Sequence, residues 1–403
     1  MFVKERETLL QDAEAIIDGY FANNDIRIEL TRYGNPLSST VAKLHLQDGS
    51  TCIGCGKGYE DEARIGAKFE AYEHLVDLSS IRANSSIVPF AQLAAQPCFA
   101  GFAPVDMIGR GHPGQIAAIR FDEAPRKTEA LLYPQFLIDY RYASNQNEED
   151  DSDYRHARRY SCGTGLAVGV GLREAAVHAL SEVIERHAIG LFLANTFFHS
   201  QPSSIRTIAR DSLSNCLAGL LFEAEEQIGG RITMIDVTSN IQVPVIAAHC
   251  QGKTISGVHV IGAGCSLYSE HATARAIKEL VQQYMIADGV DFVRQEWARH
   301  YVHLAKYPKL LRCLVADLGQ IEHKQGELPT VSSSPTDLGN HLEKLFMACD
   351  RADMPAWVKA LRREEGDITL ACAVMPKMER FSTVSLGNYV VPTSVREQME
   401  EDA

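Results

Sequence analysis

The chain has 403 residues, of which 45% are hydrophobic and 23% are charged, values typical of a globular protein with a large core. Its formal net charge is −13, with 39 Lys and Arg against 52 Asp and Glu, and it contains no long basic run. A nucleic-acid partner is therefore not expected, because such proteins carry a basic patch or stripe.

The first residues contain Glu and Asp where a signal peptide needs an uninterrupted apolar stretch. No apolar run approaches the roughly 18 residues of a membrane span. The ten cysteines are mostly isolated among apolar or small residues, which indicates reduced thiols and not a disulfide framework. Cys52 and Cys55 form one CxxC pair, but a zinc site needs a second pair, so we interpret them as strand or turn residues. Together these features predict a cytoplasmic protein without a membrane partner.

Residues 5–23 have the apolar spacing of a helix, and the alternating runs IRIEL and VAKLHL within residues 26–53 predict strands. Residues 54–58, GCGKG, are predicted to form a glycine-rich turn that opens a long helix. One face of that helix carries Glu70 and Glu73, beside an apolar stripe made of Ile65, Phe69, Tyr72 and Val76.

A loop-rich middle with several prolines follows, and residues 144–153, SNQNEEDDSD, are predicted to form a mobile acidic loop that buries nothing. A second glycine-bearing turn, SCGTGLAVGVG at 161–171, leads into a second helix. Glu182 and Glu185 share a face of this helix with His178, and the predicted apolar stripe consists of Val177, Leu180, Ile184, Ala188 and Leu191.

The runs RITMIDVT, VPVIAAHC and HVIGAGCSL predict three more strands, followed by a helix from about residue 270 to 286. Arg275, Glu279 and Gln282 share a face of that helix, opposite an apolar stripe of Ile277, Val281 and Tyr284. In the remaining chain we predict a loop at PTVSSSPT, a helix near 336–349, strands at ITLACAVM and TVSLGNYVV, and a frayed end at VREQMEEDA.

Acidic or amide side chains one helical turn apart thus occur three times, each time after a glycine-bearing segment. Residues at i and i+3 lie on one helical face, and Mg²⁺ prefers oxygen ligands together with phosphates. A single such pair is usually a solvated surface, and Arg275 with Glu279 could form a simple i,i+4 ion pair. The repetition favours a shared site for a metal and a nucleotide.

Two other phosphate-binding motifs agree less well with the sequence. The glycines between 163 and 171 resemble dinucleotide-fold spacing, but the preceding HARRYSC is not the apolar strand that a Rossmann unit requires. No GxxxxGK[ST] motif occurs, which argues against a Walker-type ATPase. Lys57 in GCGKG could bring a cation to a bound anion or could belong to a plain turn.

Three segments, GKGYEDEARIGAKFEAYEHL, SCGTGLAVGVGLREAAVHALSEVIERHA and GAGCSLYSEHATARAIKELVQQ, together resemble the YcaO-domain family, in particular its azoline-forming cyclodehydratases. The resemblance covers most of the chain. It implies a single α+β domain over residues 1–403, with mixed and antiparallel sheets and long amphipathic helices around an ATP site that has no Walker loop. Residues 1–53 would supply an N-terminal helix and strands, 54–290 the ATP-binding core, and 291–403 a part that completes the fold.

The resemblance also assigns roles residue by residue. It implies Mg²⁺ ligands at Glu70, Glu73, Glu182, Glu185 and Glu279. It implies ATP contacts from Lys57, Glu70, Glu73, Glu182, Arg186, Arg275 and Gln282, with Arg275 and Glu279 as catalytic residues and Arg6 as a basic contact near the start of the chain. The sequence departs from the family pattern at Gly66, His74 and His187, where Ser, Arg and Asp are usual, and it ends in VREQMEEDA and not in a proline-rich PxPxP tail.

The cofactors implied are ATP and Mg²⁺, and the implied reaction is cyclodehydration of a ribosomally made precursor peptide. A Cys, Ser or Thr side chain adds to the preceding backbone carbonyl, the resulting oxygen takes the γ-phosphoryl group, and loss of phosphate leaves a thiazoline or oxazoline. The alternatives are a member that forms peptide thioamides and a nucleotide-binding scaffold without activity. Family habit implies a hetero-oligomer with a separate leader-peptide-binding protein and a flavin-dependent dehydrogenase.

Overall fold

The computed structural model describes residues 5–122, 130–199, 204–319, 321–330 and 335–393. Its helices are α1 (Leu10–Asn23), α2 (Glu60–Ala83), α3 (Phe90–Ala94), α4 (Ala103–Gly109), α5 (Leu172–Leu193), α6 (Asn215–Ile228), α7 (Ser269–Gly289), α8 (Asp291–Leu304), α9 (Pro308–Val315) and α10 (Leu338–Arg351). Its strands are β1 (Arg27–Tyr33), β2 (Ser38–His45), β3 (Thr51–Gly58), β4 (Ser85–Pro89), β5 (Gln115–Phe121), β6 (Leu131–Pro134), β7 (Leu166–Val170), β8 (Ile205–Ile208), β9 (Ile232–Asp236), β10 (Val245–Cys250), β11 (Ile261–Cys265), β12 (His323–Gly326), β13 (Trp357–Arg363) and β14 (Ile368–Val374).

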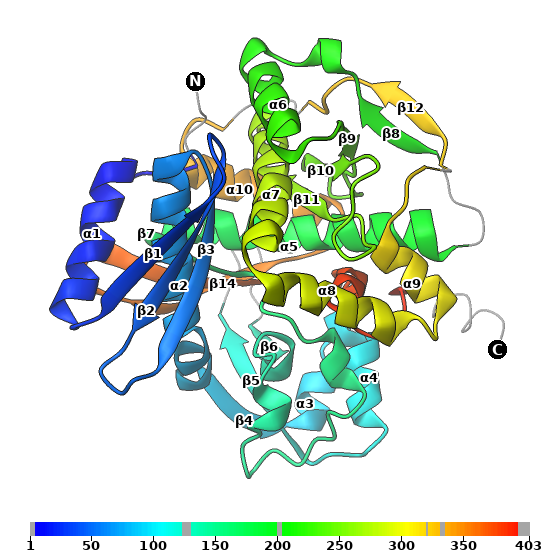
Figure 1. Cartoon of the computed structure of the whole chain (residues 1–403). Helices are drawn as coiled ribbons and strands as arrows, with labels where there is room; N and C mark the ends of the chain where they lie inside the picture. The colour runs from blue at the N-terminus through cyan, green and yellow to red at the C-terminus, as the bar shows by residue number, and fades with distance from the viewer. Residues whose placement is uncertain (1–4, 123–129, 200–203, 320, 331–334, 394–403) are drawn as a thin grey trace.

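The strands form four small sheets, with strand orders β1-β2-β3, β11-β10-β9-β8-β12, β13-β14-β7 and β4-β5-β6. All pairs are antiparallel except β8 with β12. Helix α2 packs on β3, α7 on β11, and α5 on β7 and β14, so that three strand-and-helix units surround the middle of the molecule (Figure 1). The expected α+β class with mixed and antiparallel sheets and long amphipathic helices is confirmed.

The first glycine-rich segment is a strand, and the prediction of a turn at 54–58 is wrong. These residues end β3, which pairs with β2 in register from Ser38 opposite Gly58 to His45 opposite Thr51. A Cβ atom on Gly56 would lie 1.9 Å from the carbonyl oxygen of Ala63, and one on Gly54 would lie 2.0 Å from the amide nitrogen of Ala71. The glycines therefore let the backbone of α2 lie directly against the strand.

The other two glycine-bearing segments contain strands with the same property. Cβ atoms on Gly262 and Gly264 of β11 would lie 2.2 Å and 2.1 Å from carbonyl oxygens of α7. In the second segment the turn prediction is wrong at 166–170, which form β7, and a Cβ on Gly169 would lie 2.8 Å from the amide nitrogen of Ala175 in α5. All three helices are thereby held closer to their strands than side chains would allow.

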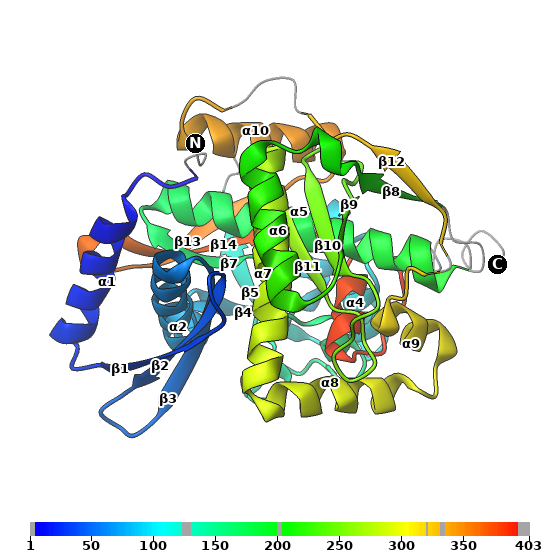
Figure 2. The ribbon, with the colours of Figure 1, turned by 45° about the horizontal axis from the view of Figure 1, so that its top comes forward.

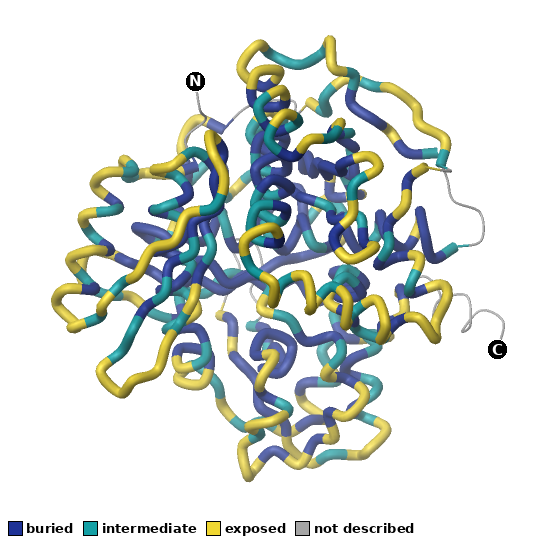
Figure 3. Tube along the Cα trace, in the orientation of Figure 1, coloured by how far each residue is buried: buried dark blue, intermediate teal, exposed yellow. Residues whose placement is uncertain are grey.

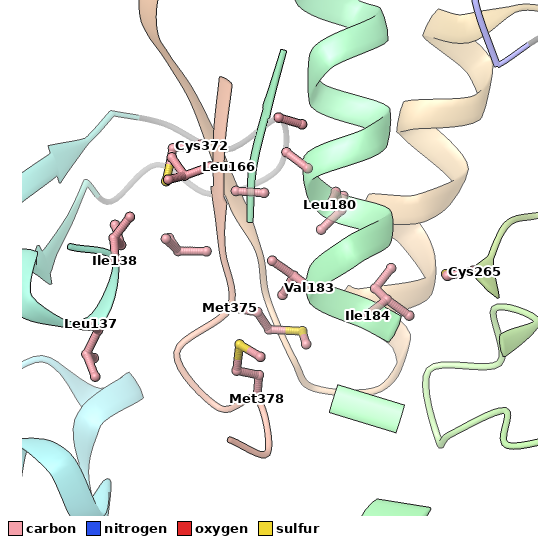
Figure 4. Close-up of a cluster of buried hydrophobic side chains, with 14 of the residues drawn as sticks. Leu137, Ile138, Leu166, Leu180, Val183, Ile184, Cys265, Cys372, Met375 and Met378 are labelled. Atoms are coloured by element: carbon pink, nitrogen blue, oxygen red, sulfur yellow. The ribbon is translucent and has the colours of Figure 1, made fainter. Parts of the chain in front are cut away.

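Helix α5 runs through the centre of the molecule and packs on two sides (Figure 1). Its apolar side chains Leu180 and Val183 lie on the side of β7 and β14, and Ile184 is directed toward Cys265 of β11 (Figure 4). The predicted stripe is buried except at Leu191, which is half-buried. The predicted stripes of α2 and α7 are buried throughout.

The acidic run at 144–153 differs from the expectation that it buries nothing. Asp150 and Ser152 are both buried. The Asp150 carboxylate accepts hydrogen bonds from the backbone N–H of Ala117 and from the hydroxyls of Tyr142 and Tyr154, at 2.7–2.9 Å. These three donors satisfy the charge, and the bond from Ala117 attaches the run to β5, the middle strand of the β4-β5-β6 sheet.

The C-terminal region agrees with the prediction at α10 and β14 and disagrees at TVSLGNYVV. Residues Phe381–Leu386 form a 3₁₀-helix in which the Thr383 amide donates to the Arg380 carbonyl. Gly387 then adopts a left-handed conformation with φ 76°. These local i to i+3 hydrogen bonds use the backbone groups that a strand would need for pairing. The loop predicted at PTVSSSPT lies partly outside the described residues, and VREQMEEDA lies wholly outside them.

Two alternatives from the sequence are resolved by the fold. Strand β7 belongs to an antiparallel sheet, so the glycines at 163–171 do not open a Rossmann unit. Cys52 and Cys55 lie three residues apart on β3, which places their side chains on opposite faces of the sheet. None of the helices in the described part of the chain has the length and apolar content needed to cross a bilayer.

We predict that Gly56→Ala destabilises the fold by about 2–3 kcal/mol, because the new Cβ would overlap the backbone of α2 and force the helix away from β3. The measurement is denaturant unfolding. Gly66→Ala is the matched control, since a Cβ at this position of α2 has nothing closer than 3.6 Å and the change favours helix by up to about 1 kcal/mol. Equal stability of the two variants would contradict the proposed close packing.

Candidate active site between three helices

The site residues lie near the middle of the three helices that pack on the glycine-bearing strands. Glu70 and Glu73 lie within α2, Glu182 and Glu185 within α5, and Glu279 within α7. Figure 2 shows α7 crossing in front of α5 with α2 at its side, and Figure 3 shows α5 and α7 running mainly through buried and half-buried parts of the trace. These are mid-helix positions, where the backbone N–H groups are already hydrogen bonded within the helix.

Strand β3 and helix α7 are joined by two side-chain contacts. The ammonium of Lys57 donates to the carboxylate of Glu279 in an ion pair. The amide Nε2 of Gln282, one turn further along α7, donates to the backbone carbonyl of Cys55 at 2.8 Å. The i,i+4 ion pair considered for Arg275 and Glu279 is absent among the described residues, because each side chain has another partner.

Helix α5 carries a cation between its two carboxylates. The Arg186 guanidinium lies 3.7 Å from Glu182 and 3.9 Å from Glu185. Glu182 also accepts a hydrogen bond of 3.2 Å from the backbone N–H of Gly165, in the segment that leads into β7. Glu185 is almost fully buried, and its Oε2 has no hydrogen-bond partner among the described residues. A buried carboxylate oxygen without a donor is a site where a bound cation would be stabilising.

The charges of the three helices act on one another. Burial, followed by the negative charges of Glu182 and Glu70, raises the pKa of Glu73 well above its usual value. Burial likewise raises the pKa of Glu70 and Glu185. Burial acts in the same direction on Glu279, but the cations of Lys57 and Arg186 lower its pKa below the usual value. The five carboxylates therefore form one electrostatic unit.

Arg275 of α7 has two partners outside this group of five carboxylates. Its Nη1 lies 3.5 Å from Nδ1 of His178 and 3.8 Å from the carboxylate of Glu5. Burial, followed by the charges of Arg6 and Arg275, lowers the pKa of His178 to about 3, so the ring is neutral and its Nδ1 can accept. Arg6 forms an ion pair of 3.6 Å with Glu174 at the start of α5.

Sequence reasoning missed Glu5 and did not assign a role to His178. Nothing in the local pattern distinguishes Glu5, because its contacts are more than 260 positions away, with Ser266 just before α7 and with residues of α7 and α10. His178 had a usable signal, since it lies one turn before Glu182 on the same face of α5.

The residues fit Mg²⁺ with a nucleotide better than they fit a metal alone. The described residues contain no group of three His, Cys, Asp or Glu side chains arranged to hold a metal ion. Mg²⁺ is usually held by one or two carboxylates together with waters and substrate phosphates, so a complete protein cage is not required. The side chains of Lys57, Glu182, Arg186, Arg275 and Glu279 keep 14–36% of their surface exposed, which leaves them accessible to such a ligand.

A family model described as YcaO cyclodehydratase, ATP- and Mg²⁺-binding, matches residues 55–379. The chain belongs to the YcaO family. The match includes α2, α5 and α7, the end of β3, and the five glutamates of these helices, whereas Glu5 lies before it. The family binds ATP and Mg²⁺, which confirms the cofactors expected from the sequence, and its members are ATP-dependent enzymes.

Solved structures of YcaO proteins and heterocyclases share the fold. The YcaO protein from Methanopyrus kandleri, bound with AMPPCP and Mg²⁺, is 16% identical, with a TM-score of 0.65 and 96% of each chain covered. A heterocyclase in complex with substrate and cofactor is 18% identical, with a TM-score of 0.62, and the match covers 94% of this chain and 54% of that one. The Escherichia coli microcin synthetase McbBCD complex gives 14% identity, a TM-score of 0.56 and 88% coverage of each chain. A curated relative of unassigned function from Methanothermobacter thermautotrophicus is 27% identical over 292 residues, 70% of each chain.

We predict that Glu73→Gln raises the Tm of the nucleotide-free protein at neutral pH by about 2–4 °C. The raised pKa of Glu73 means that folding favours its uncharged form, so the stability from this form is present at low pH and is lost as the pH rises through the folded-state pKa. The amide keeps the uncharged state at every pH, and the Tm gap between variant and wild type should widen with pH.

Differential scanning calorimetry between pH 5 and 8, with and without Mg·ATP, measures both effects. The same variant should lose most of the ligand-induced rise in Tm. Glu149→Gln, an exposed glutamate in the acidic run, is the control and should match the wild type throughout. A variant less stable than the wild type at neutral pH would show that the Glu73 charge is not destabilising.

Proposed function

We propose that this protein uses ATP and Mg²⁺ to activate a backbone amide of a ribosomally made precursor peptide, forming thiazoline or oxazoline rings in the biosynthesis of a modified, bacteriocin-like peptide. The observation that carries the proposal is the electrostatic unit of five glutamates from α2, α5 and α7, flanked by Lys57, Arg186 and Arg275. Family membership supports cyclodehydratase chemistry, and the family description supports the use of both cofactors.

In the proposed arrangement the glutamates would hold Mg²⁺, and ATP would be the substrate whose γ-phosphoryl group turns the amide oxygen into a leaving group. The cationic side chains Lys57, Arg186 and Arg275 would offset the charge of the triphosphate, with Arg275 and Glu279 as the proposed catalytic residues. Catalysis of this kind depends mainly on position and on fixed charges. Arg275 suits it because its guanidinium is already oriented by His178 and Glu5 before the ligand binds.

Partner proteins are part of the proposal. The similar solved structures include a synthetase complex of three named components, the same complex with pro-MccB17 bound, and a heterocyclase with its substrate. These support a peptide substrate and a hetero-oligomer, in which a separate protein binds the leader peptide and a flavin-dependent dehydrogenase oxidises azolines. We propose that this assembly acts in the cytoplasm.

The test is reconstitution with ATP, Mg²⁺, the proteins of neighbouring genes and the candidate precursor peptide. Each ring formed removes the mass of one water, whereas a thioamide adds the mass difference between sulfur and oxygen and requires a sulfur donor. Mass spectrometry of the peptide therefore separates the two reactions. A peptide that remains unmodified, with no ATP consumed, would contradict the proposal.

We predict that Glu182→Gln lowers turnover by at least about a hundredfold, because it removes a charge from the proposed metal site, while assembly with partner proteins persists. Glu226→Gln, an exposed glutamate on α6, is the matched control and should retain wild-type turnover. Turnover is measured as phosphate release and ring formation, and assembly by size-exclusion chromatography. Unchanged ring formation in Glu182→Gln would favour the scaffold alternative.

A further inference from the structure

Glu5 is a buried carboxylate that the proposed reaction does not use. Its side chain is 2% exposed, although it lies in an extended segment before α1. One carboxylate oxygen accepts from the hydroxyl of Ser266 and lies 3.7 Å from His341 of α10. The other lies 3.2 Å from His271 and 3.8 Å from Arg275, both on α7. Glu5 thus joins the start of the chain to α7 and α10.

The position of Glu5 at the beginning of α7 stabilises its negative charge. The Ser266 hydroxyl that donates to Glu5 accepts from the backbone N–H of Tyr268, the residue before the helix. His271 and Arg275 are one turn apart and present their side chains to the same carboxylate. A carboxylate near a helix N-terminus is also favoured by the helix dipole. The pKa of Glu5 is accordingly far below its usual value despite burial, with His271 and Arg275 as the main causes.

Arg275 has two sets of anionic neighbours that compete for it. Glu5 lies 3.8 Å from its guanidinium, and the negative charges of Glu185 and Glu279 also act on this group. Neutral His178 accepts from the same Nη1 that faces Glu5, so these two partners hold one edge of the guanidinium. The other donors of the planar group have no hydrogen-bond partner among the described residues and can meet a phosphate.

Without the Glu5 charge, the carboxylates acting on the positive charge of Arg275 would be Glu185 and Glu279, which are proposed to hold Mg²⁺. An ion pair between Arg275 and Glu185 or Glu279 would turn the guanidinium toward them and occupy oxygens that the metal needs. Because Glu5 supplies a third carboxylate that pairs with Arg275, this competition is prevented. The arrangement explains why an acidic side chain is buried next to a site that must bind an anion.

We propose that Glu5 is a positioning residue that holds Arg275 away from the metal-binding carboxylates and ready for the nucleotide. The inference rests on the proposed function, because it assigns Arg275 to the triphosphate. Glu5 itself touches neither ATP nor peptide in this proposal, and its effect is transmitted through Arg275 alone. That restriction makes the role separable from a general contribution to folding.

The experiment is a double-mutant cycle with Glu5→Gln and Arg275→Gln in the full chain, read out as the affinity for Mg·ATP by isothermal titration calorimetry. Glu5→Gln is expected to weaken binding by about tenfold, the effect of losing one charge-assisted contact. Arg275→Gln should weaken it at least as much. In the Arg275→Gln background, Glu5→Gln should have no further effect, because Glu5 then has no arginine to position.

Glu7→Gln is the matched control. Glu7 lies in the same segment, but its half-exposed carboxylate pairs with Arg173 at 3.7 Å and makes no contact with Arg275 among the described residues. This variant should bind Mg·ATP like the wild type. A loss in Glu7→Gln equal to that in Glu5→Gln would mean that the segment as a whole matters, and it would overturn the specific role of Glu5.

The remaining outcomes are equally decisive. Wild-type affinity in Glu5→Gln, or losses that add fully in the double variant, would overturn the inference. If Glu5→Gln does not fold, Glu5→Asp replaces it, since this variant keeps the charge and shortens the side chain by one methylene. The affinity of Glu5→Asp for Mg·ATP should be lower than that of the wild type. An affinity equal to that of the wild type would overturn the positioning role. Failure of the wild-type chain to bind Mg·ATP would overturn the proposed function, and this inference with it.

Discussion

The site depends on the close approach of three helices to three strands. Gly54 and Gly56 admit the backbone of α2, Gly262 and Gly264 admit that of α7, and Gly169 admits the start of α5. Protein interiors are packed so tightly that a single methyl group at such a contact must move one of the two elements. These glycines thus determine how closely the three helices, and with them their carboxylates, approach the strands.

That packing brings together charges that would otherwise separate. The raised pKa values of Glu70, Glu73 and Glu185 reflect the free-energy cost of burying negative charges without enough cations or hydrogen-bond donors beside them. The cations Lys57, Arg186 and Arg275 are distributed among them and offset part of this cost. A divalent cation bound at the proposed site would offset the remaining cost.

Sequence reasoning recovered what is encoded locally. The stripe of Ile65, Phe69 and Tyr72 identified α2, and helical spacing placed Glu70 beside Glu73, because both depend only on residues within a few turns. The predictions were wrong or incomplete where contacts with residues far away in the sequence determine the local structure. A glycine-rich run is usually a turn, but here it pairs with β2 and accommodates the backbone of α2 at Gly54 and Gly56, so it is a strand. Asp150 is buried against β5, where the backbone N–H of Ala117, 33 positions away, donates to it. The proposed role of Glu5 depends on contacts such as that with Ser266, which is 261 positions away in the sequence.

The placement of Glu70, Glu182 and Glu279 in mid-helix has a consequence for ligand selection. Phosphate loops meet their ligand with backbone N–H groups at a helix N-terminus, and these attract an anion whether or not a metal accompanies it. Mid-helix backbone is already hydrogen bonded, so a nucleotide at the proposed site would meet mainly side chains, and most of these are negative. Uncomplexed ATP would therefore be repelled by the carboxylates proposed to bind its magnesium complex. The proposed site would thereby select the metal-loaded nucleotide before any peptide is engaged.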